Sequence, residues 1–125
     1  MKHALEVIKD ELNGIGIPYE FMRWTDAVDG QYWVGEYTET PSITEDGYEE
    51  STLLLTGTTR GSWMELEESK DKIKHLFPAV GGYRTTTETG ALCVFYDNAL
   101  PVPTGEAELK RMQINLHIKQ WKGMN

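Results

Sequence analysis

The side chains that could do chemistry in this sequence are three histidines, one cysteine and a group of carboxylates. His3, His75 and His117 could each accept a proton or bind a metal, but none has a second histidine or a carboxylate at ligand spacing. Cys93 lies in an apolar run typical of a buried strand, and a single cysteine excludes an internal disulfide and a multi-cysteine zinc site. We predict no catalytic residue, no metal site and no cofactor, and therefore a protein that is not an enzyme.

Carboxylates are concentrated between residues 36 and 50. An EF-hand calcium loop needs alternating Asp or Asn ligands and a terminal Glu, and residues 44–50 lack that pattern. Two interpretations stay open: a solvated acidic loop, or an acidic surface that faces a pore or a partner. The residues of this acidic segment are Glu36, Glu39, Glu45, Asp46, Glu49 and Glu50.

Two glycines precede an expected helix, a position at which a helix N-terminus could attract phosphate. Residues 55–62 lack the lysine of a P-loop and the spacing of a dinucleotide fingerprint. Gly57 and Gly61 are more simply explained by a bulge and a turn.

Composition limits the class of protein further. The 125 residues include 12 basic and 20 acidic side chains, so the net charge is -8, and such a chain is not expected to grip nucleic acid phosphates. Residues 1–62 hold four basic and twelve acidic residues, whereas the remainder is balanced at eight of each. No apolar stretch is long enough to span a bilayer and the N-terminus lacks a signal peptide, so we expect a soluble protein inside the cell that makes it.

The first half of the chain predicts a helix and two strands that must position the acidic segment. Apolar residues at helical spacing predict a helix over residues 4–12 that stops at Asn13-Gly14. Aromatic-rich stretches predict strands at residues 19–24 and 31–38, joined by a turn at 26–30 as a hairpin. Residues 39–47 combine a proline, a glycine and three carboxylates, and predict a loop.

The second half predicts a strand, a helix and three further strands. Residues 48–58 form the third strand, whose Leu53-Leu54-Leu55 run is typical of a strand covered on both faces. Ser62 and Glu65 fit a capping box at the start of a helix that ends before Pro78. Strands follow at 83–87 and 91–96, then a loop at 97–105 and a long alternating strand at 110–120.

These elements predict one α+β domain over residues 1–125, in the order α-β-β-β-α-β-β-β, with a mostly antiparallel or mixed sheet and helices packed on it. The expected hairpin is unusually aromatic for so small a protein. Its rings either form an interface, where aromatic residues are enriched, or are ordinary core residues with a few exposed rings. The residues concerned are Tyr19, Phe21, Trp24, Tyr32, Trp33 and Tyr37.

The sequence resembles the small tail-terminator or tail-completion (minor tail) proteins of long-tailed bacteriophages and prophages. The resemblance rests on a short amphipathic N-terminal helix, a hairpin, an acidic loop, and a strand that passes into a helix over residues 48–67. The helix carries a pattern of Trp, then Leu-Glu, then Lys-x-x-Ile, which is Trp63, Leu66-Glu67 and Lys70-Asp71-Lys72-Ile73 here. The long amphipathic last strand is similar as well.

The resemblance implies a non-enzymatic protein that assembles as a ring, often a hexamer, between the tail tube and the head-tail connector. DNA would pass through the ring without being gripped, and an acidic lining would suit that passage. The protein would then be made in the bacterial cytoplasm and end in the virion tail. The alternative is a monomeric bacterial domain that binds a small molecule or a partner protein with the aromatic hairpin.

Overall fold

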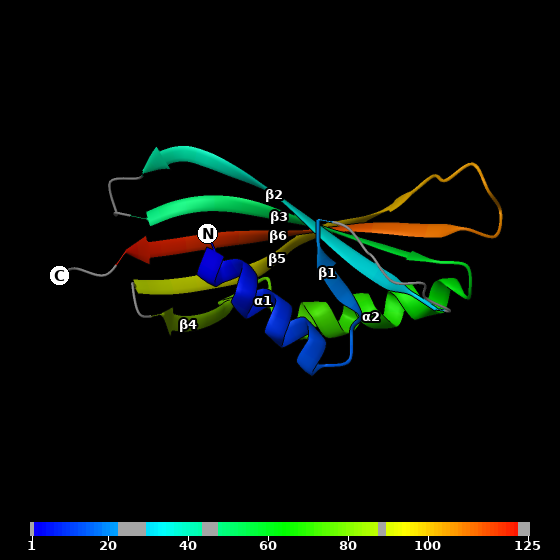
Figure 1. Ribbon diagram of the computed structural model, residues 1–125, viewed down its shortest axis with the longest axis horizontal. Coiled ribbons are helices and arrows are strands. Elements are labelled where there is room, and N and C mark those ends of the chain that lie inside the picture. Colours follow the sequence, from blue (N-terminus) through cyan, green and yellow to red (C-terminus); the bar gives the residue numbers. More distant parts are fainter. Residues whose placement is uncertain (1, 23–29, 44–47, 88–89, 123–125) are drawn as a thin grey trace.

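The computed structural model describes residues 2–22, 30–43, 48–87 and 90–122 as two helices and one six-stranded sheet (Figure 1). The strands lie in the order β1-β2-β3-β6-β5-β4. All neighbouring strands are antiparallel except β1 and β2, which are parallel, so the sheet is mixed. In chain order the elements are α1 (Lys2–Gly14), β1 (Tyr19–Phe21), β2 (Tyr32–Ile43), β3 (Tyr48–Thr59), α2 (Trp63–Leu76), β4 (Tyr83–Thr87), β5 (Gly90–Val102) and β6 (Lys110–Lys122).

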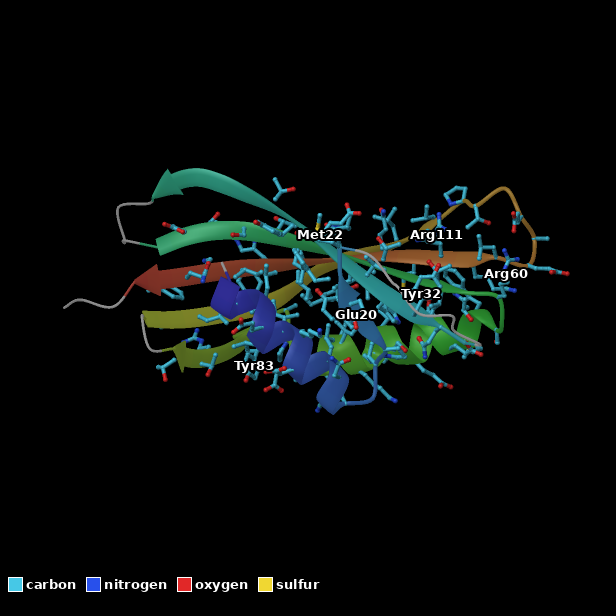
Figure 2. The ribbon with its side chains drawn as sticks, viewed as in Figure 1. Glu20, Met22, Tyr32, Arg60, Tyr83 and Arg111 are labelled. Carbon is cyan, nitrogen blue, oxygen red and sulfur yellow. The ribbon has the colours of Figure 1, made fainter. Side chains whose placement is uncertain are left out.

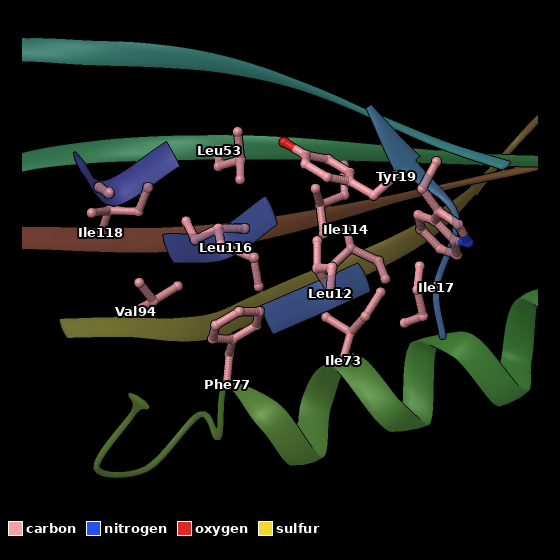
Figure 3. Packing of buried hydrophobic residues seen from close by; sticks show 14 of the residues in the cluster. Leu12, Ile17, Tyr19, Leu53, Ile73, Phe77, Val94, Ile114, Leu116 and Ile118 are labelled. Atoms are coloured by element: carbon pink, nitrogen blue, oxygen red, sulfur yellow. The ribbon is translucent and has the colours of Figure 1, made fainter. Parts of the chain in front are cut away.

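The α+β class and the order of elements agree with the sequence prediction. The core lies between one face of the sheet and both helices (Figure 3). Alternate residues of the central strands point into it, as the two-residue period of a strand requires. The strands contribute Leu53, Leu55, Met112, Ile114, Leu116, Ile118, Leu92 and Val94, and the helices contribute Ala4, Ile8, Leu12, Leu66 and Ile73, with Phe77 following α2.

The expectation that Leu53-Leu54-Leu55 is covered on both faces is wrong. Leu53 and Leu55 are fully buried under the helices, whereas Leu54 is only half-buried on the opposite side. Both helices lie on the same face, so the third strand is covered on one face only. Neither helix, over the residues that the structure describes, is long and apolar enough to cross a membrane.

The predicted hairpin between the first two strands is also wrong. β1 is three residues long and runs parallel to β2, with Tyr19 beside Trp33. The pairing begins with Trp33 N donating to Pro18 O at 2.9 Å and ends with Met22 N donating to Gly35 O at 2.8 Å. This arrangement buries the rings of Tyr19 and Trp33 under the helices. The free energy gained by burying them favours the parallel pairing over the hairpin that the local sequence prefers. Residues 23–29, which hold most of the predicted turn, lie outside the described part.

Two predicted loops are largely strand. β2 continues to Ile43 and β5 to Val102, because sheet hydrogen bonds come from the backbone and also form where side chains are polar. A register shift between Thr40 and Ile43 spans Pro41, which cannot donate to the ladder. A second shift, between Tyr96 and Asn98, lets β5 continue along β6.

The start of α2 differs in detail from a capping box. The Ser62 hydroxyl accepts a hydrogen bond from Met64 N at 3.1 Å, so Ser62 is the N-cap. Glu65, in contrast, accepts from Thr59 Oγ1 at 2.9 Å. The carboxylate therefore ties the helix to the end of β3.

Candidate functional site: the bare face and the edges of the sheet

The sheet face opposite the helices, which we call the bare face, presents the side chains that alternate with the core residues. The half-buried polar residues of β6 lie at its centre, and no described helix covers them. Representative members are Glu36, Thr52, Leu54, Arg84, Phe95, Asn98, Leu100, Arg111, Gln113, Asn115, His117 and Lys119, with Glu50 beside His117.

Polar side chains on the bare face contact one another across the strands. His117 Nε2 lies 3.6 Å from Glu50 Oε2, and the His117 ring lies 5.0 Å from that of Phe95. Asn115 donates to Asn98 Oδ1 at 2.7 Å. These cross-strand contacts hold the surface in a defined pattern.

A cavity of about 580 Å³ opens on the bare face beside β4 and β5. Its lining includes Phe95, Trp121 and Cys93 together with the cations Arg84 and Lys119. Lys119 Nζ lies 5.7 Å from the centre of the Phe95 ring, and Arg84 Nε donates to Gly81 O at 3.0 Å. Apolar walls with two cations suit a small anionic molecule that has an apolar body.

Charge divides the sheet into two halves. The strands β1, β2 and β3 contain five acidic residues and no basic residue, whereas β6, β5 and β4 contain five basic residues and one acidic residue. Because the strands of each group are neighbours in the sheet, one half is acidic and the other basic. The acidic set is Glu20, Glu36, Glu39, Glu49 and Glu50, and the basic set is Arg84, Lys110, Arg111, Lys119 and Lys122.

Both halves end in an exposed strand edge. β1 pairs only with Trp33, Val34 and Gly35, so among the described residues the outer edge of β2 is unpaired beyond Gly35. Three successive residues there, Glu36, Tyr37 and Thr38, are exposed. At the other end of the strand order, β4 pairs with β5 alone within the described chain.

The structure places four of the six predicted acidic residues on strands. Glu36 is exposed on β2, and Glu49 and Glu50 are half-buried at the start of β3. Glu39 belongs to β2 and pairs with Ser51, and its side chain lies outside the described part. Glu45 and Asp46 also lie outside it. Among the described residues no group of three or more His, Cys, Asp or Glu is placed to hold a metal ion.

Two of the predicted interface aromatics are core residues. Tyr19 is 2% and Trp33 0% exposed, so these two rings face the helices rather than a partner. Phe21 and Tyr37 stack with their ring centres 5.7 Å apart, and Tyr37 is 41% exposed. Tyr32 is half-buried and labelled in Figure 2. Trp24 lies outside the described residues.

The other chemically interesting side chains are dispersed. His3 belongs to α1, with its side chain outside the description, His75 is exposed near the end of α2, and His117 lies beside Glu50. Cys93 is 7% exposed, which confirms its predicted burial. The sequence analysis missed the cavity, since its lining comes from several segments that only the register of β4, β5 and β6 brings together.

Burial raises the pKa values of two tyrosine hydroxyls. Burial raises the pKa of Tyr19, and the neighbouring Glu20 raises it further. Burial also raises the pKa of Tyr83, whose hydroxyl donates to Glu11 Oε1 at 3.0 Å. Both phenols are therefore held neutral in the fold. Neither lies on the bare face.

Comparisons with known proteins show the fold and no family. No protein-family model and no curated protein matches the sequence. Solved structures do match, and one of them has a TM-score of 0.72 at 11% sequence identity, covering 100% of this chain and 99% of its own. The name of that protein states no function. The likeness establishes a shared α+β fold alone.

Proposed function

We propose that this protein is a non-enzymatic structural component of a phage or prophage tail, a tail terminator or head-tail joining protein that works by forming a ring. The division of the sheet into an acidic and a basic half, each ending in an exposed edge, is the observation that carries this proposal. Complementary charges on two different edges favour contacts between unlike surfaces of identical copies. Contacts between unlike surfaces generate rings when the rotation between copies closes.

The acidic end of β2 and β3 is the surface we assign to the pore or to the tail tube. Figure 1 shows these two strands running past the N-terminal end of α1, which leaves their ends uncovered by that helix. Glu49 and Glu50 belong to this end, and Glu39 of β2 pairs with Ser51 beside them. A lining of one sign repels the phosphates of DNA, so the duplex would slide past without binding.

The proposed partners are further copies of this chain, the tail-tube protein and the head-tail connector. Assembly would take place in the bacterial cytoplasm, and the ring would remain in the virion tail. Tail-tube or tape-measure genes beside the gene for this protein would agree with this assignment, and a metabolic operon would contradict it.

The direct test of this function is capping of tail tubes. Purified protein would be added to tail tubes that lack a terminator, and the ends would be viewed by negative-stain electron microscopy. We expect a ring at one end of each tube and no retention of duplex DNA at physiological salt. The proposal fails if the protein neither caps tubes nor associates with itself.

A second candidate function is the binding of a small anionic molecule in the cavity beside β4 and β5. The observation in its favour is that the cavity of about 580 Å³ is lined by the cations Arg84 and Lys119 together with the apolar rings of Phe95 and Trp121. A thermal-shift screen of aromatic carboxylates tests it, because a bound ligand raises Tm with the logarithm of its concentration. Loss of that shift in Arg84→Gln would assign the ligand to this cavity.

A further inference from the structure

We propose that a pocket at one end of the sheet binds the phosphate group of a small phosphate monoester, with Arg60 and Arg111 as its charged contacts. The pocket lies where β2 begins, β3 ends and β6 begins, and its volume is about 390 Å³. It shares no described lining residue with the cavity beside β4 and β5. The site is independent of the proposed ring.

The register of three strands builds one wall of the pocket. Tyr32 of β2 lies opposite Thr58 of β3, and Thr58 lies opposite Arg111 of β6. Residues paired in this way point to the same face of a sheet, here the bare face. Figure 2 labels Tyr32 and Arg111 near this end of the sheet, together with Arg60 from the connection between β3 and α2. Segments that are distant in the sequence therefore meet at one pocket.

Arg111 is a half-buried cation with a neutral partner. Its Nε donates to Thr58 Oγ1 at 3.3 Å, and Thr58 is 4% exposed, so the guanidinium is anchored from below. No carboxylate of the described chain forms an ion pair with Arg111. A charge that is partly removed from water is stabilised by an opposite charge. A bound anion would supply that charge through the N–H groups of the two Nη atoms.

Arg60 brings a second cation to the pocket. Its Nη1 lies 3.4 Å from Glu106 Oε2, and the two side chains are 65% and 58% exposed. An ion pair this exposed to water contributes little free energy, because water solvates both charges and salt screens them. Arg60 can therefore exchange Glu106 for a ligand, and Glu106 competes with that ligand.

The two guanidinium groups favour phosphate over other anions. Each presents N–H donors in a planar fork that matches two oxygens of a phosphate group. A phosphate monoester carries about -1.5 to -2 charges at neutral pH, which balances two cations. The volume of the pocket lies within the roughly 300–1,000 Å³ typical of small-molecule sites, so an organic body fits beside the phosphate. Leu109 and Tyr32 line the space for that body.

The charge of the whole chain favours a small ester over a nucleic acid. The net charge of -8 repels a long polyanion, whereas a small ester meets mainly the local field of the two arginines. The phosphate group is therefore assigned to a small molecule rather than to the backbone of DNA.

An NMR titration of the full chain tests the site. The amide signals of labelled protein would be followed while glycerol phosphate, or inorganic phosphate, is added at fixed ionic strength. We expect saturable shifts at the amides of Thr58, Arg60 and Arg111, with glycerol phosphate binding at least as tightly as inorganic phosphate. Shifts that chloride reproduces, or that do not saturate, would overturn the proposal.

Four variants locate the binding. Arg111→Gln should weaken it by about tenfold or more, and Arg60→Gln should weaken it less. Glu106→Gln should strengthen binding by up to about fivefold, because the competing carboxylate is gone, and a misfolded protein could not give that result. Arg84→Gln, in the cavity beside β4 and β5, is the matched control and should leave the affinity unchanged.

Two results would contradict this assignment. Affinity lost in Arg84→Gln and kept in Arg111→Gln would move the phosphate to the cavity beside β4 and β5. Duplex DNA that binds the wild-type chain and not Arg111→Gln would show a site for the nucleic acid backbone instead of a small ester. Circular dichroism would verify that each variant is folded.

Discussion

The Tyr19 hydroxyl is buried in the core without a hydrogen-bond partner among the described residues. It occupies the space that a side chain at position 35 would take, since a Cβ built on Gly35 would overlap it. Only glycine leaves this room on β2. A buried hydroxyl without a partner is destabilising, because it loses its hydrogen bonds to water.

Tyr19→Phe is therefore expected to leave the free energy of unfolding unchanged or to raise it by about 1 kcal/mol. The ring and its burial stay, and only the unpartnered hydroxyl is removed. Urea unfolding followed by tryptophan fluorescence measures the change. A loss of more than about 1 kcal/mol would mean that the hydroxyl makes a stabilising hydrogen bond in solution.

The raised pKa values of Tyr19 and Tyr83 predict a loss of stability in alkali. Both groups stay protonated in the folded protein, whereas the unfolded chain releases these protons near the usual phenol pKa of about 10. Their contribution is complete below that pH and declines as the pH rises above it. Unfolding free energies measured between pH 8 and pH 11 should fall, and less steeply in Tyr19→Phe with Tyr83→Phe. An equal slope in the double variant would contradict this explanation.

At the scale of elements, the ring of Trp33 on β2 packs closely against Gly57 on β3. Trp33 pairs with Gly57 across the two strands, and a Cβ on Gly57 would come within 2.5 Å of the Trp33 ring. Trp33 is fully buried, and its indole nitrogen donates to Gln31 Oε1 at 3.0 Å. Gly57 is thus required by packing, and the bulge expected from the sequence is wrong, because β3 runs through Gly57 without a register shift.

Gly57→Ala should destabilise the protein by about 1–3 kcal/mol, because the added methyl group forces the ring or the strand to move. Gly14→Ala is the control, since nothing lies within 4 Å of a Cβ at that position. Thermal unfolding of the two variants provides the comparison. Equal melting temperatures would show that the Trp33 ring can move away at no cost.

The sequence predicts well the elements whose apolar pattern agrees with their burial in the fold. α2 has a cap and an apolar stripe, and β6 alternates along its length, so both were found. The parallel pairing of β1 could not be inferred, because local patterns do not encode which edge a strand meets. The extensions of β2 and β5 were missed since their residues are polar at exposed ends. For the candidate site, the acidic residues can be listed from the sequence, but their separation from a basic half depends on strand order.

At the scale of the whole molecule, the charged residues of the strands are segregated along the strand order, although six acidic and five basic strand residues account for little of the net charge of -8. The strands of the first half are acidic and those of the second half are mainly basic. Charges of this kind act over about 10 Å at about 0.1 M salt and are screened further as salt is added. Contacts between copies that depend on them should therefore weaken with ionic strength.

The measurement that tests the central claim most directly is light scattering coupled to size-exclusion chromatography, over a range of concentrations at low and high salt. The account predicts a single closed oligomer larger than a dimer at high concentration in low salt, which dissociates as salt or dilution increases. A molecule that elutes as a monomer of 14.2 kDa at every concentration and salt would contradict it.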